Sequence, residues 1–394
     1  MSSAPRLLAL GAVLRQYEDY WRPAPFWQRH PAWCDSTPDL VAAVMTLNDA
    51  ETEILAADNA RLWRWLARYM PDWAHFAELC ALPAPRHDPI PDLGRRSWHI
   101  PGRKQAQIQA FADVLGEPVA AIVEWCSGKG HLGRHLGSQW QLPVLSLELD
   151  AALCAAGQDF ADHMALDQTF LQADALATGS AAHLAQRHAV ALHACGDLHR
   201  ALLVGAKAHG ALAIDLAPCC YYRINTPRYQ PFNPEADVPL SQSDLHLAVT
   251  ETTTAGGRER RQRDVAMARK LGYLAWCHDH GDASRQAGLK PVPAAWNRRP
   301  FADYVQAMAA RDGLGWDARA DWRAYAETGR ARQKEVMRLS LIRLAFRRPL
   351  EIWLALDQAL YLERADYAVT LREFCAPGLT PRNLLLSARR QATI

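Results

Sequence analysis

The stretch VEWCSGKGHL at residues 123–132 decides the fold of this chain. A short apolar run over residues 119–123 ends in the carboxylate of Glu124, and a loop containing Gly128 and Gly130 leads into a segment able to start a helix. An α/β sheet uses this arrangement to present backbone N–H groups and a helix N-terminus to an adenosine-containing ligand. Glycines also serve any turn that needs positive φ angles, so the residues that follow decide the interpretation.

Strand-like and helical segments alternate from residue 103 to residue 216. The pattern predicts helices over 104–115, 131–139, 151–163, 181–187 and 198–208, with strands over 119–123, 143–149, about 170–175, 189–193 and 211–216. This alternation indicates βαβ units and a parallel sheet with helices on both faces. Two further runs, 367–374 and 383–387, predict a closing antiparallel pair. The predicted fold class is α/β, with a Rossmann-like, mostly parallel sheet and a final antiparallel hairpin.

The segments outside this alternation are mainly helical. Residues 1–95 predict a tryptophan-rich accessory domain, with helices starting at Pro38 and spanning 51–70 and 72–82. Its tryptophans are either a base-stacking platform or core packing, and packing is the commoner use. Residues 83–101 have the composition of a linker. The second domain spans 98–394 and carries a lid or insertion at about 219–365, irregular at first and helical over 258–270 and 317–363.

Composition narrows the class of protein. The chain has 394 residues, of which 49% are hydrophobic and 22% charged, and a net charge of +2, values ordinary for a folded protein of two or more domains. Its nine cysteines show no disulfide framework, and we find neither a signal peptide nor an apolar run long enough to span a bilayer. We therefore expect a cytoplasmic protein without a membrane anchor. The sequence does not indicate its oligomeric state.

Carboxylates at three strand ends favour one cofactor class. A dinucleotide fold carries G-x-G-x-x-G after its first strand, whereas this chain reads Glu124-x-Cys126-x-Gly128-x-Gly130. Glu148, after the second strand, can accept both ribose hydroxyls, and Asp174 stands where an adenine amino group could bind. Each acid alone is equally explained as a strand-end cap. Together they favour S-adenosylmethionine over a nicotinamide dinucleotide, with Glu124 acting on the ligand's ammonium.

The fourth strand ends in the turn LHACGDL at residues 192–198. It lacks the Asn/Asp-Pro-Pro-aromatic turn of enzymes that methylate exocyclic amino groups of bases, which disfavours that chemistry. His193 and Asp197 are candidate general bases or parts of the pocket floor. His193, Cys195, Cys219 and Cys220 suggest zinc, but the C-x₂-C spacing is missing and adjacent cysteines are awkward ligands. We predict no metal.

Three motifs together carry a family resemblance: EWCSGKGHL at 124–132, LHACGDL at 192–198 and APCCYY at 217–222. The set resembles the methyltransferase-like protein 25 family of class I S-adenosylmethionine-dependent methyltransferases and, more distantly, the tRNA 2′-O-methyltransferases that modify the acceptor stem. PGRK at 101–104, VPLS at 238–241 and LTPRN at 379–383 support it. The resemblance covers about residue 98 to the C-terminus.

The resemblance implies a seven-stranded methyltransferase sheet and a set of site residues. Its cofactor loop corresponds to Glu124, Gly128 and Gly130, and its ribose acid to Glu148. From the sequence itself we add Cys126, Asp174 and His193 as cofactor-binding residues. The substrate side of the pocket is predicted at Cys219, Cys220, Tyr221 and Tyr222. Cys126 departs from the family, which usually has glycine there. Its side chain would crowd the methionine end of the cofactor unless the loop keeps a negative φ at that position.

The predicted function is methyl transfer from S-adenosylmethionine, with RNA (tRNA or rRNA) as the first acceptor and a protein side chain, such as one of a ribosome-associated protein, as the second. The arginine-rich stretches 258–263 and 330–348 are either solvated helix faces or phosphate-binding surfaces. The alternative is a non-catalytic protein that keeps the fold and binds the cofactor or RNA. An NAD-dependent oxidoreductase is the third possibility and is disfavoured.

Overall fold

The computed structural model describes residues 3–83, 102–236, 238–250, 256–280, 289 and 291–391. Two compact units make up the chain. The sheet unit groups residues 1–16, 75–254 and 346–394, and the helical unit groups residues 17–74 and 255–345. Nearly all of the linker predicted over 83–101 lies outside the described residues.

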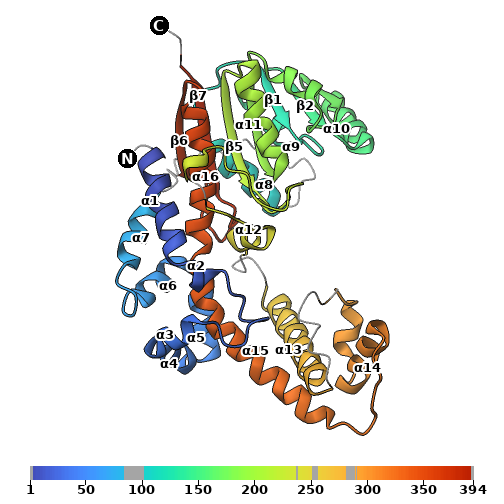
Figure 1. Cartoon of the computed structure of the whole chain (residues 1–394). Coiled ribbons are helices and arrows are strands. Elements are labelled where there is room, and N and C mark those ends of the chain that lie inside the picture. The colour runs from blue at the N-terminus through green and yellow to red at the C-terminus, as the bar shows by residue number, and fades with distance from the viewer. Residues whose placement is uncertain are drawn as a thin grey trace. The chain divides into compact units, whose positions relative to one another are not determined.

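The sheet unit is built on seven strands in the order β3-β2-β1-β4-β5-β7-β6 (Figure 1). The strands are β1 (Ile122–Trp125), β2 (Val144–Glu148), β3 (Gln168–Gln172), β4 (His188–Cys195), β5 (Ala213–Cys219), β6 (Tyr367–Glu373) and β7 (Leu384–Arg390). Strands β1 to β5 pair in parallel, and β7 runs antiparallel to both β5 and β6. This is a Rossmann-like class I methyltransferase sheet, so the predicted fold class is confirmed, including the closing antiparallel pair.

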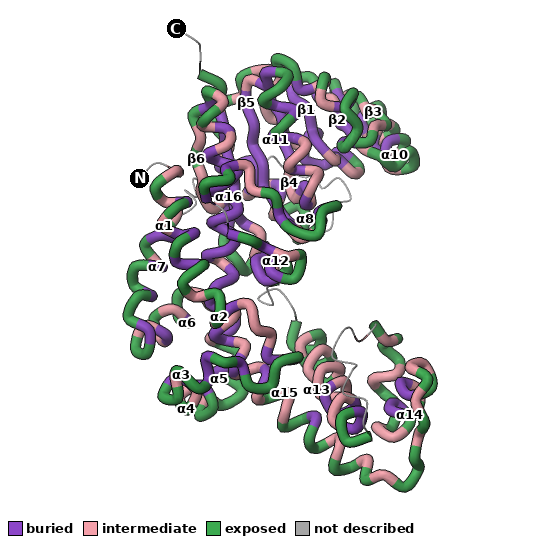
Figure 2. The backbone as a smooth tube through the Cα atoms, viewed as in Figure 1, coloured by how far each residue is buried: buried purple, intermediate pink, exposed green. Residues whose placement is uncertain are grey.

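Alternating side chains of the strands feed two cores on opposite faces of the sheet. Val123 and Trp125 join one core, whereas Ile122 joins the other with Phe111 and Leu136. The central strands are consequently buried along most of their length (Figure 2). The helices of this unit are α1 (Ser3–Gln16), α8 (Gly102–Asp113), α9 (His131–Trp140), α10 (Ala151–His163), α11 (Asp197–His209), α12 (Gln242–Ala248) and α16 (Arg347–Glu363), with the 3₁₀ helices η1 (Thr178–Leu184) and η2 (Pro234–Ala236). Helix α7 (Trp73–Cys80) begins at the boundary between the units.

Helix α1 belongs to the sheet unit although it lies at the N-terminus. It packs on α16, and the Ser3 hydroxyl donates a 2.5 Å hydrogen bond to Glu363. A Cβ atom on Gly11 would lie 3.1 Å from Trp353 Nε1, so the small residue permits the close approach. Helix α16 itself is buried over most of its length, although it falls within the predicted insertion. The two compact units therefore differ in their residues from the two predicted domains, 1–95 and 98–394.

The helical unit contains the remaining helices. These are α2 (Glu18–Trp21), α3 (Trp33–Ser36), α4 (Pro38–Thr46), α5 (Asp49–Ala57), α6 (Asn59–Leu66), α13 (Gly257–Asp279), η4 (Ala294–Arg298), α14 (Phe301–Asp312) and α15 (Trp322–Leu344). Among the tryptophans of residues 1–95, Trp21, Trp33 and Trp73 are buried and serve as packing groups, whereas Trp27 is exposed. Packing was the favoured of the two sequence interpretations.

Two predicted helices are each divided in the structure. The helix expected over 51–70 is α5 followed by α6, because Asp58 adopts an extended backbone and its side chain caps the N–H of Arg61 at 3.0 Å. The helix expected over 317–363 is α15 followed by α16, and the segment predicted over 181–187 is the 3₁₀ helix η1. Helix α14 was not predicted. No helix of the described residues is both long and apolar enough to cross a membrane.

Candidate functional site

A cavity of about 670 Å³ opens at the carboxyl ends of β1, β4 and β5. This is the edge of the sheet where the strand order reverses between β1 and β4, the usual ligand position in such folds. Its walls come from helix α8, the β1–α9 loop, the ends of β4 and β5 and the segment around 380–382. The volume lies within the range of small-molecule sites.

The β1–α9 loop holds three residues in the left-handed region, with φ values of 57° at Cys126, 58° at Gly128 and 67° at Gly130. The two glycines differ in their surroundings. A Cβ atom on Gly130 would lie 2.3 Å from Phe170 Cζ, whereas one on Gly128 would meet nothing within 4 Å. Gly130 therefore permits packing beneath the loop, while Gly128 leaves open space on the cavity side.

Gly133 adds a third glycine, so that residues 128–133 do have the G-x-G-x-x-G spacing. A Cβ atom there would lie 2.5 Å from Glu124 Oε2 and 2.8 Å from Val144 Cγ1, which identifies its role as close helix–strand packing. The sequence comparison that began at Cys126 overlooked this glycine. The glycines therefore do not separate the two cofactor classes, but the antiparallel β7 between β5 and β6 does, because a dinucleotide sheet continues in parallel.

We expected the side chain of Cys126 to leave room for the cofactor only if its φ were negative, and the structure does not meet this condition. Its φ is +57°, not negative, and the residue is half-buried in the cavity wall. A left-handed conformation costs a residue with a Cβ atom roughly 1–2 kcal/mol. Burial, followed by the charges of Glu148 and Asp174, raises the pKa of the thiol to about 12. The thiol therefore stays protonated and is a poor nucleophile.

Glu124 lies at the inner end of the cavity, on a strand whose four residues are all buried. Its carboxylate accepts a 2.7 Å hydrogen bond from the Ser146 hydroxyl. Burial raises the pKa of the carboxyl group to about 7, against the opposing effect of its hydrogen bonds and of Arg134 and Lys104. A buried carboxylate of this kind gains most from a cationic ligand, which would compensate its lost hydration.

The acids after β2 and β3 lie next to the loop without lining the cavity. Glu148 accepts hydrogen bonds from three backbone N–H groups, at 2.8 Å from Gly128, 2.8 Å from Leu149 and 3.0 Å from Asp150. A carboxylate has about four acceptor sites, so capacity for a ribose hydroxyl remains. Asp174 is exposed and accepts a hydrogen bond from the Leu176 N–H at 2.9 Å. Both acids thus cap local backbone, and their roles toward a cofactor stay predictions.

The end of β4 is irregular at His193. The register with β5 shifts between Leu192 and Ala194, and His193 takes a φ of 66°. Its ring lines the cavity with Nε2 3.3 Å from Gln107 Oε1, and Nδ1 is buried without a hydrogen-bond partner among the described residues. Burial and then Arg382 lower the pKa of the imidazole to about 4, so it is neutral at neutral pH.

Asp197 lies outside the cavity lining. It stands at the start of α11 and accepts a hydrogen bond from the Asn225 N–H at 2.8 Å, while its own N–H donates to the carbonyl of Arg223 at 3.0 Å. These contacts fix the chain that leaves β5 against the turn after β4. Of the two candidate catalytic residues, the structure brings only His193 into the cavity.

The motif that follows β5 is divided between the cavity and the core. Cys219 and Cys220 line the cavity, whereas Tyr221 is only 1% exposed and meets His199 edge-to-face. Tyr222 stacks on the ring of His246 at 3.7 Å. The structure therefore places the two cysteines, but neither tyrosine, on the wall of the cavity.

Basic residues that the sequence did not select as site residues also line this cavity. Arg103 and Lys104 come from α8 and Arg382 from the segment before β7. Arg103 Nε donates to the Leu379 carbonyl at 3.0 Å, which ties these two segments together. The two segments belong to the motifs at 101–104 and 379–383 that support the family resemblance, and this was the sequence feature that could have identified them. Helical periodicity alone does not show whether an arginine lines a cavity.

Comparison with known families agrees with this geometry. Residues 103–227, which contain β1 to β5, match the model of a family described as a methyltransferase domain. The cofactor of such a domain is S-adenosylmethionine. The open space at Gly128, the buried carboxylate of Glu124 and the unpartnered Nδ1 of His193 fit a ligand of that kind.

Two solved structures show weaker similarity. One comes from work on the "Conversion of a Disulfide Bond into a Thioacetal Group during Echinomycin Biosynthesis", with 19% identity over 29% of this chain and 48% of that chain and a TM-score of 0.23. The chain thus spans about half the length of that protein. The other is the cyclopropane synthase MmaA2 from Mycobacterium tuberculosis, with 14% identity over 73% of this chain and 82% of that chain and a TM-score of 0.26. Both TM-scores are too low to support an inference.

Proposed function

We propose that this chain transfers a methyl group from S-adenosylmethionine to RNA, with tRNA and rRNA as the first candidates. The observation that carries the proposal is the charge of the cavity wall. Arg103, Lys104 and Arg382 line it, and the only carboxylate among the described lining residues is that of Glu124, which is 3% exposed. A cavity with exposed cations and a single buried acid suits an acceptor that carries phosphates.

When bound, S-adenosylmethionine supplies an electrophilic methyl group on a sulfonium. The chain's own residues would position the two reactants. Glu124 attracts the ammonium of the methionine moiety, Glu148 accepts the ribose hydroxyls, and the neutral His193 accepts a hydrogen bond from an acceptor hydroxyl. With a pKa of about 4, His193 is a weak base, so orientation accounts for more of the rate than proton removal.

Further support for RNA comes from the sequence. The three motifs that resemble the methyltransferase-like protein 25 family also resemble, more distantly, tRNA 2′-O-methyltransferases. In the helical unit, Arg258 and Arg261 are exposed near the N-terminal end of α13, where phosphates could bind them. We extend the proposal to a cytoplasmic location, where RNA acceptors are present and the nine free cysteines would stay reduced.

Transfer of a labelled methyl group tests the acceptor directly. Purified protein and labelled S-adenosylmethionine are incubated with total RNA and total protein from cells that lack this chain. We expect the label in RNA. Label confined to protein would contradict the RNA proposal and favour a protein side chain, including one of a ribosome-associated protein.

Charge-neutralising variants test how RNA is held. The double variant Lys104→Gln with Arg382→Gln removes two cations of the cavity wall. The control is Lys207→Gln, because Lys207 is an exposed lysine in the last turn of α11 and does not line the cavity. RNA affinity is measured at several salt concentrations, and each lost phosphate contact should reduce the slope of log affinity against log salt concentration by about one. The control should leave the slope unchanged. Equal slopes for all three proteins would contradict a phosphate-binding role for this wall.

A non-catalytic protein that retains the fold is the second candidate, and the observation that favours it is the left-handed Cys126. Calorimetric titration with S-adenosylmethionine separates the two candidates. Heat of binding together with methyl transfer supports the enzyme. Binding without transfer into any fraction supports the second candidate, and the absence of binding rules out methyl transfer by this chain.

A further inference from the structure

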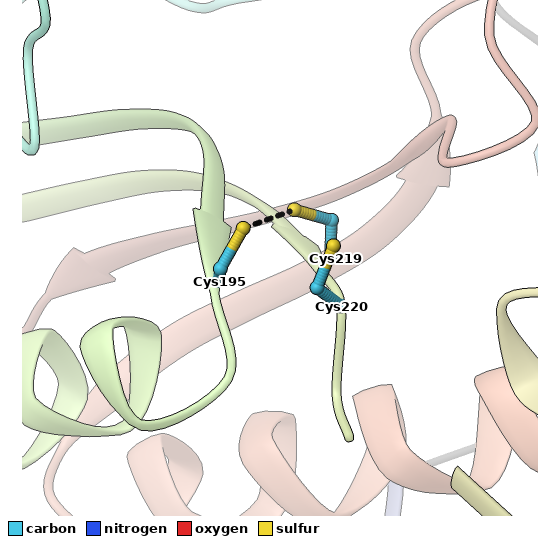
Figure 3. A group of neighbouring side chains, drawn as sticks. All are labelled: Cys195, Cys219 and Cys220. Atoms are coloured by element: carbon cyan, nitrogen blue, oxygen red, sulfur yellow. Dashed lines mark hydrogen bonds between the residues drawn. The ribbon is translucent and has the colours of Figure 1, made fainter. Parts of the chain in front are cut away.

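We propose that Cys195, Cys219 and Cys220 bind a Zn²⁺ ion whose fourth coordination position faces the cofactor cavity. The three sulfur atoms lie within 4.8 Å of one another, at the adjacent ends of β4 and β5 (Figure 3). All three residues line the cavity described above. This inference does not depend on the proposed acceptor, because an ion could be bound whether or not RNA is methylated.

The spacing of the sulfur atoms suits a tetrahedral ion. A Zn–S distance of about 2.3 Å with tetrahedral angles places two thiolates about 3.8 Å apart. The sulfur atoms of Cys195 and Cys219 are 3.4 Å apart, and that of Cys220 lies within 4.8 Å of both. Movements of a few tenths of an ångström up to about 1 Å would therefore complete the site. Thiolates select borderline and soft ions such as Zn²⁺ over Mg²⁺ or Ca²⁺.

The fold explains how two adjacent cysteines reach one ion, which the sequence alone disfavoured. Cys195 and Cys219 are partners in the parallel register of β4 and β5. Successive residues of a strand point to opposite faces, so an extended Cys220 would point away from Cys219. Instead Cys220 has a φ of 44°, in the left-handed region, and its sulfur turns back toward the other two. Such strain in a residue with a Cβ atom is typical of functional sites.

Two guanidinium groups supply positive charge beside the cluster. Arg223 and Arg382 both interact electrostatically with Cys220. Three thiolates and one Zn²⁺ carry a net charge of −1, which these guanidinium groups would offset. Ordinary core cysteines of this chain, such as Cys154 and Cys375, belong to no cluster of metal-ligating side chains among the described residues.

The number of ligands indicates what kind of zinc site this would be. Structural zinc is usually closed by four protein ligands, whereas catalytic zinc has three and leaves one position for water or substrate. The described residues supply three thiols. The open position would face the cavity that holds Glu124 and His193, so an oxygen, nitrogen or sulfur atom of an acceptor could occupy it.

The test is metal binding by the full chain after removal of bound metal under reducing conditions. Zn²⁺ is titrated in competition with a chromophoric chelator, and Co²⁺ serves as a spectroscopic probe because thiolate ligation gives charge-transfer and tetrahedral ligand-field bands. We expect one ion per chain. Cys195→Ser and Cys220→Ser should each reduce affinity by at least the 10–100-fold that loss of a partner group outside the ligands typically costs.

The matched control is Cys154→Ser, since Cys154 is a cysteine of α10 outside the cluster. It should bind Zn²⁺ and Co²⁺ like the unaltered chain. Circular dichroism of the metal-free proteins separates lost ligation from lost folding. The proposal is overturned if the unaltered chain gives no thiolate–Co²⁺ band or if the cysteine variants retain full affinity.

Discussion

Gly130 and Gly128 offer a comparison in which backbone conformation is nearly constant and only the available space differs. Their φ values are 67° and 58° in the same loop, but a Cβ atom would lie 2.3 Å from Phe170 Cζ at Gly130 and would contact nothing within 4 Å at Gly128. Gly130→Ala should therefore destabilise the sheet unit far more than Gly128→Ala does. The difference between the two variants isolates the cost of the contacts with Phe170 and with Gln168 Nε2, from which the Cβ atom would lie 2.5 Å.

The expected magnitudes follow from two contributions. Alanine in a left-handed conformation costs roughly 1–2 kcal/mol, reduced by about 0.4–1 kcal/mol because the unfolded chain loses freedom. We therefore expect Gly128→Ala to lower the free energy of unfolding by about 1 kcal/mol. Overpacking adds about 1–3 kcal/mol at Gly130, for a total of about 2–4 kcal/mol.

The assay is urea unfolding followed by pulsed hydrogen exchange, read on peptides that cover β1 and α9. The urea midpoint for these peptides should fall for both variants, and by two- to fourfold more for Gly130→Ala. Titration with S-adenosylmethionine gives a second, independent result. Gly128→Ala adds a methyl group on the cavity side, so it should weaken binding while remaining folded. Equal midpoints for the two variants would refute the assignment of Gly130 to packing.

Three further changes test the site and its support. Burial raises the pKa of Glu124 to about 7 from 4.5, so its contribution to the free energy of unfolding falls by about 3 kcal/mol as pH rises from 4.5 to 7, because the folded chain holds the extra proton. Histidines such as His193, whose pKa is lowered to about 4, contribute with the opposite sign in parent and variant alike. The difference in urea midpoint between the parent and Glu124→Gln should therefore change by the equivalent of about 3 kcal/mol over that range, and a constant difference would contradict the raised pKa. Cys126→Gly should bind S-adenosylmethionine at least as tightly as the parent in calorimetry, whereas Cys126→Ala keeps the backbone strain; weaker binding by the glycine variant would contradict crowding by the thiol. Asp215→Ala should lower the urea midpoint by the equivalent of about 3–5 kcal/mol, because the buried carboxylate binds His188 Nε2 at 2.7 Å and Arg389 at 2.9 Å; a loss below about 1 kcal/mol would show that neither partner depends on it.

Much of the sheet was predictable because short-range patterns determine it. The helix expected over 151–163 is α10, residue for residue, since Asp150 caps it and a histidine ends it. The closing strands were also located, since the turn at 378–382 separates two apolar runs. What the sequence missed has two causes. The local cap of Asp58 divides a helix whose apolar spacing is continuous, and the place of α1 in the sheet unit depends on long-range contacts, mainly with α16.

The candidate site shows the same division. Glu124, Gly128 and His193 were identifiable because each stands near a strand end or in the loop that follows it, within a recognisable motif, and the cavity is lined by all three. Asp197 and Tyr221 share those motifs but point into local contacts that residue type does not reveal. The convergence of the cysteines was equally hidden. It depends on the left-handed φ of Cys220 and on the register of β4 with β5, and the spacing of the cysteines in the sequence predicts neither.

The position of β7 has a consequence for how the protein is made. The last strand in the sequence lies between β5 and β6, and the segment just before it contributes Thr380 and Arg382 to the cavity. During synthesis, β1 to β5 can pair while the chain is still growing, but β5 keeps an unpaired edge until residues 384–390 have emerged. An apolar strand exposed for that long is an aggregation hazard. Shielding by a chaperone, or rapid docking of α16 on the half-built sheet, would protect this edge until β7 pairs with it.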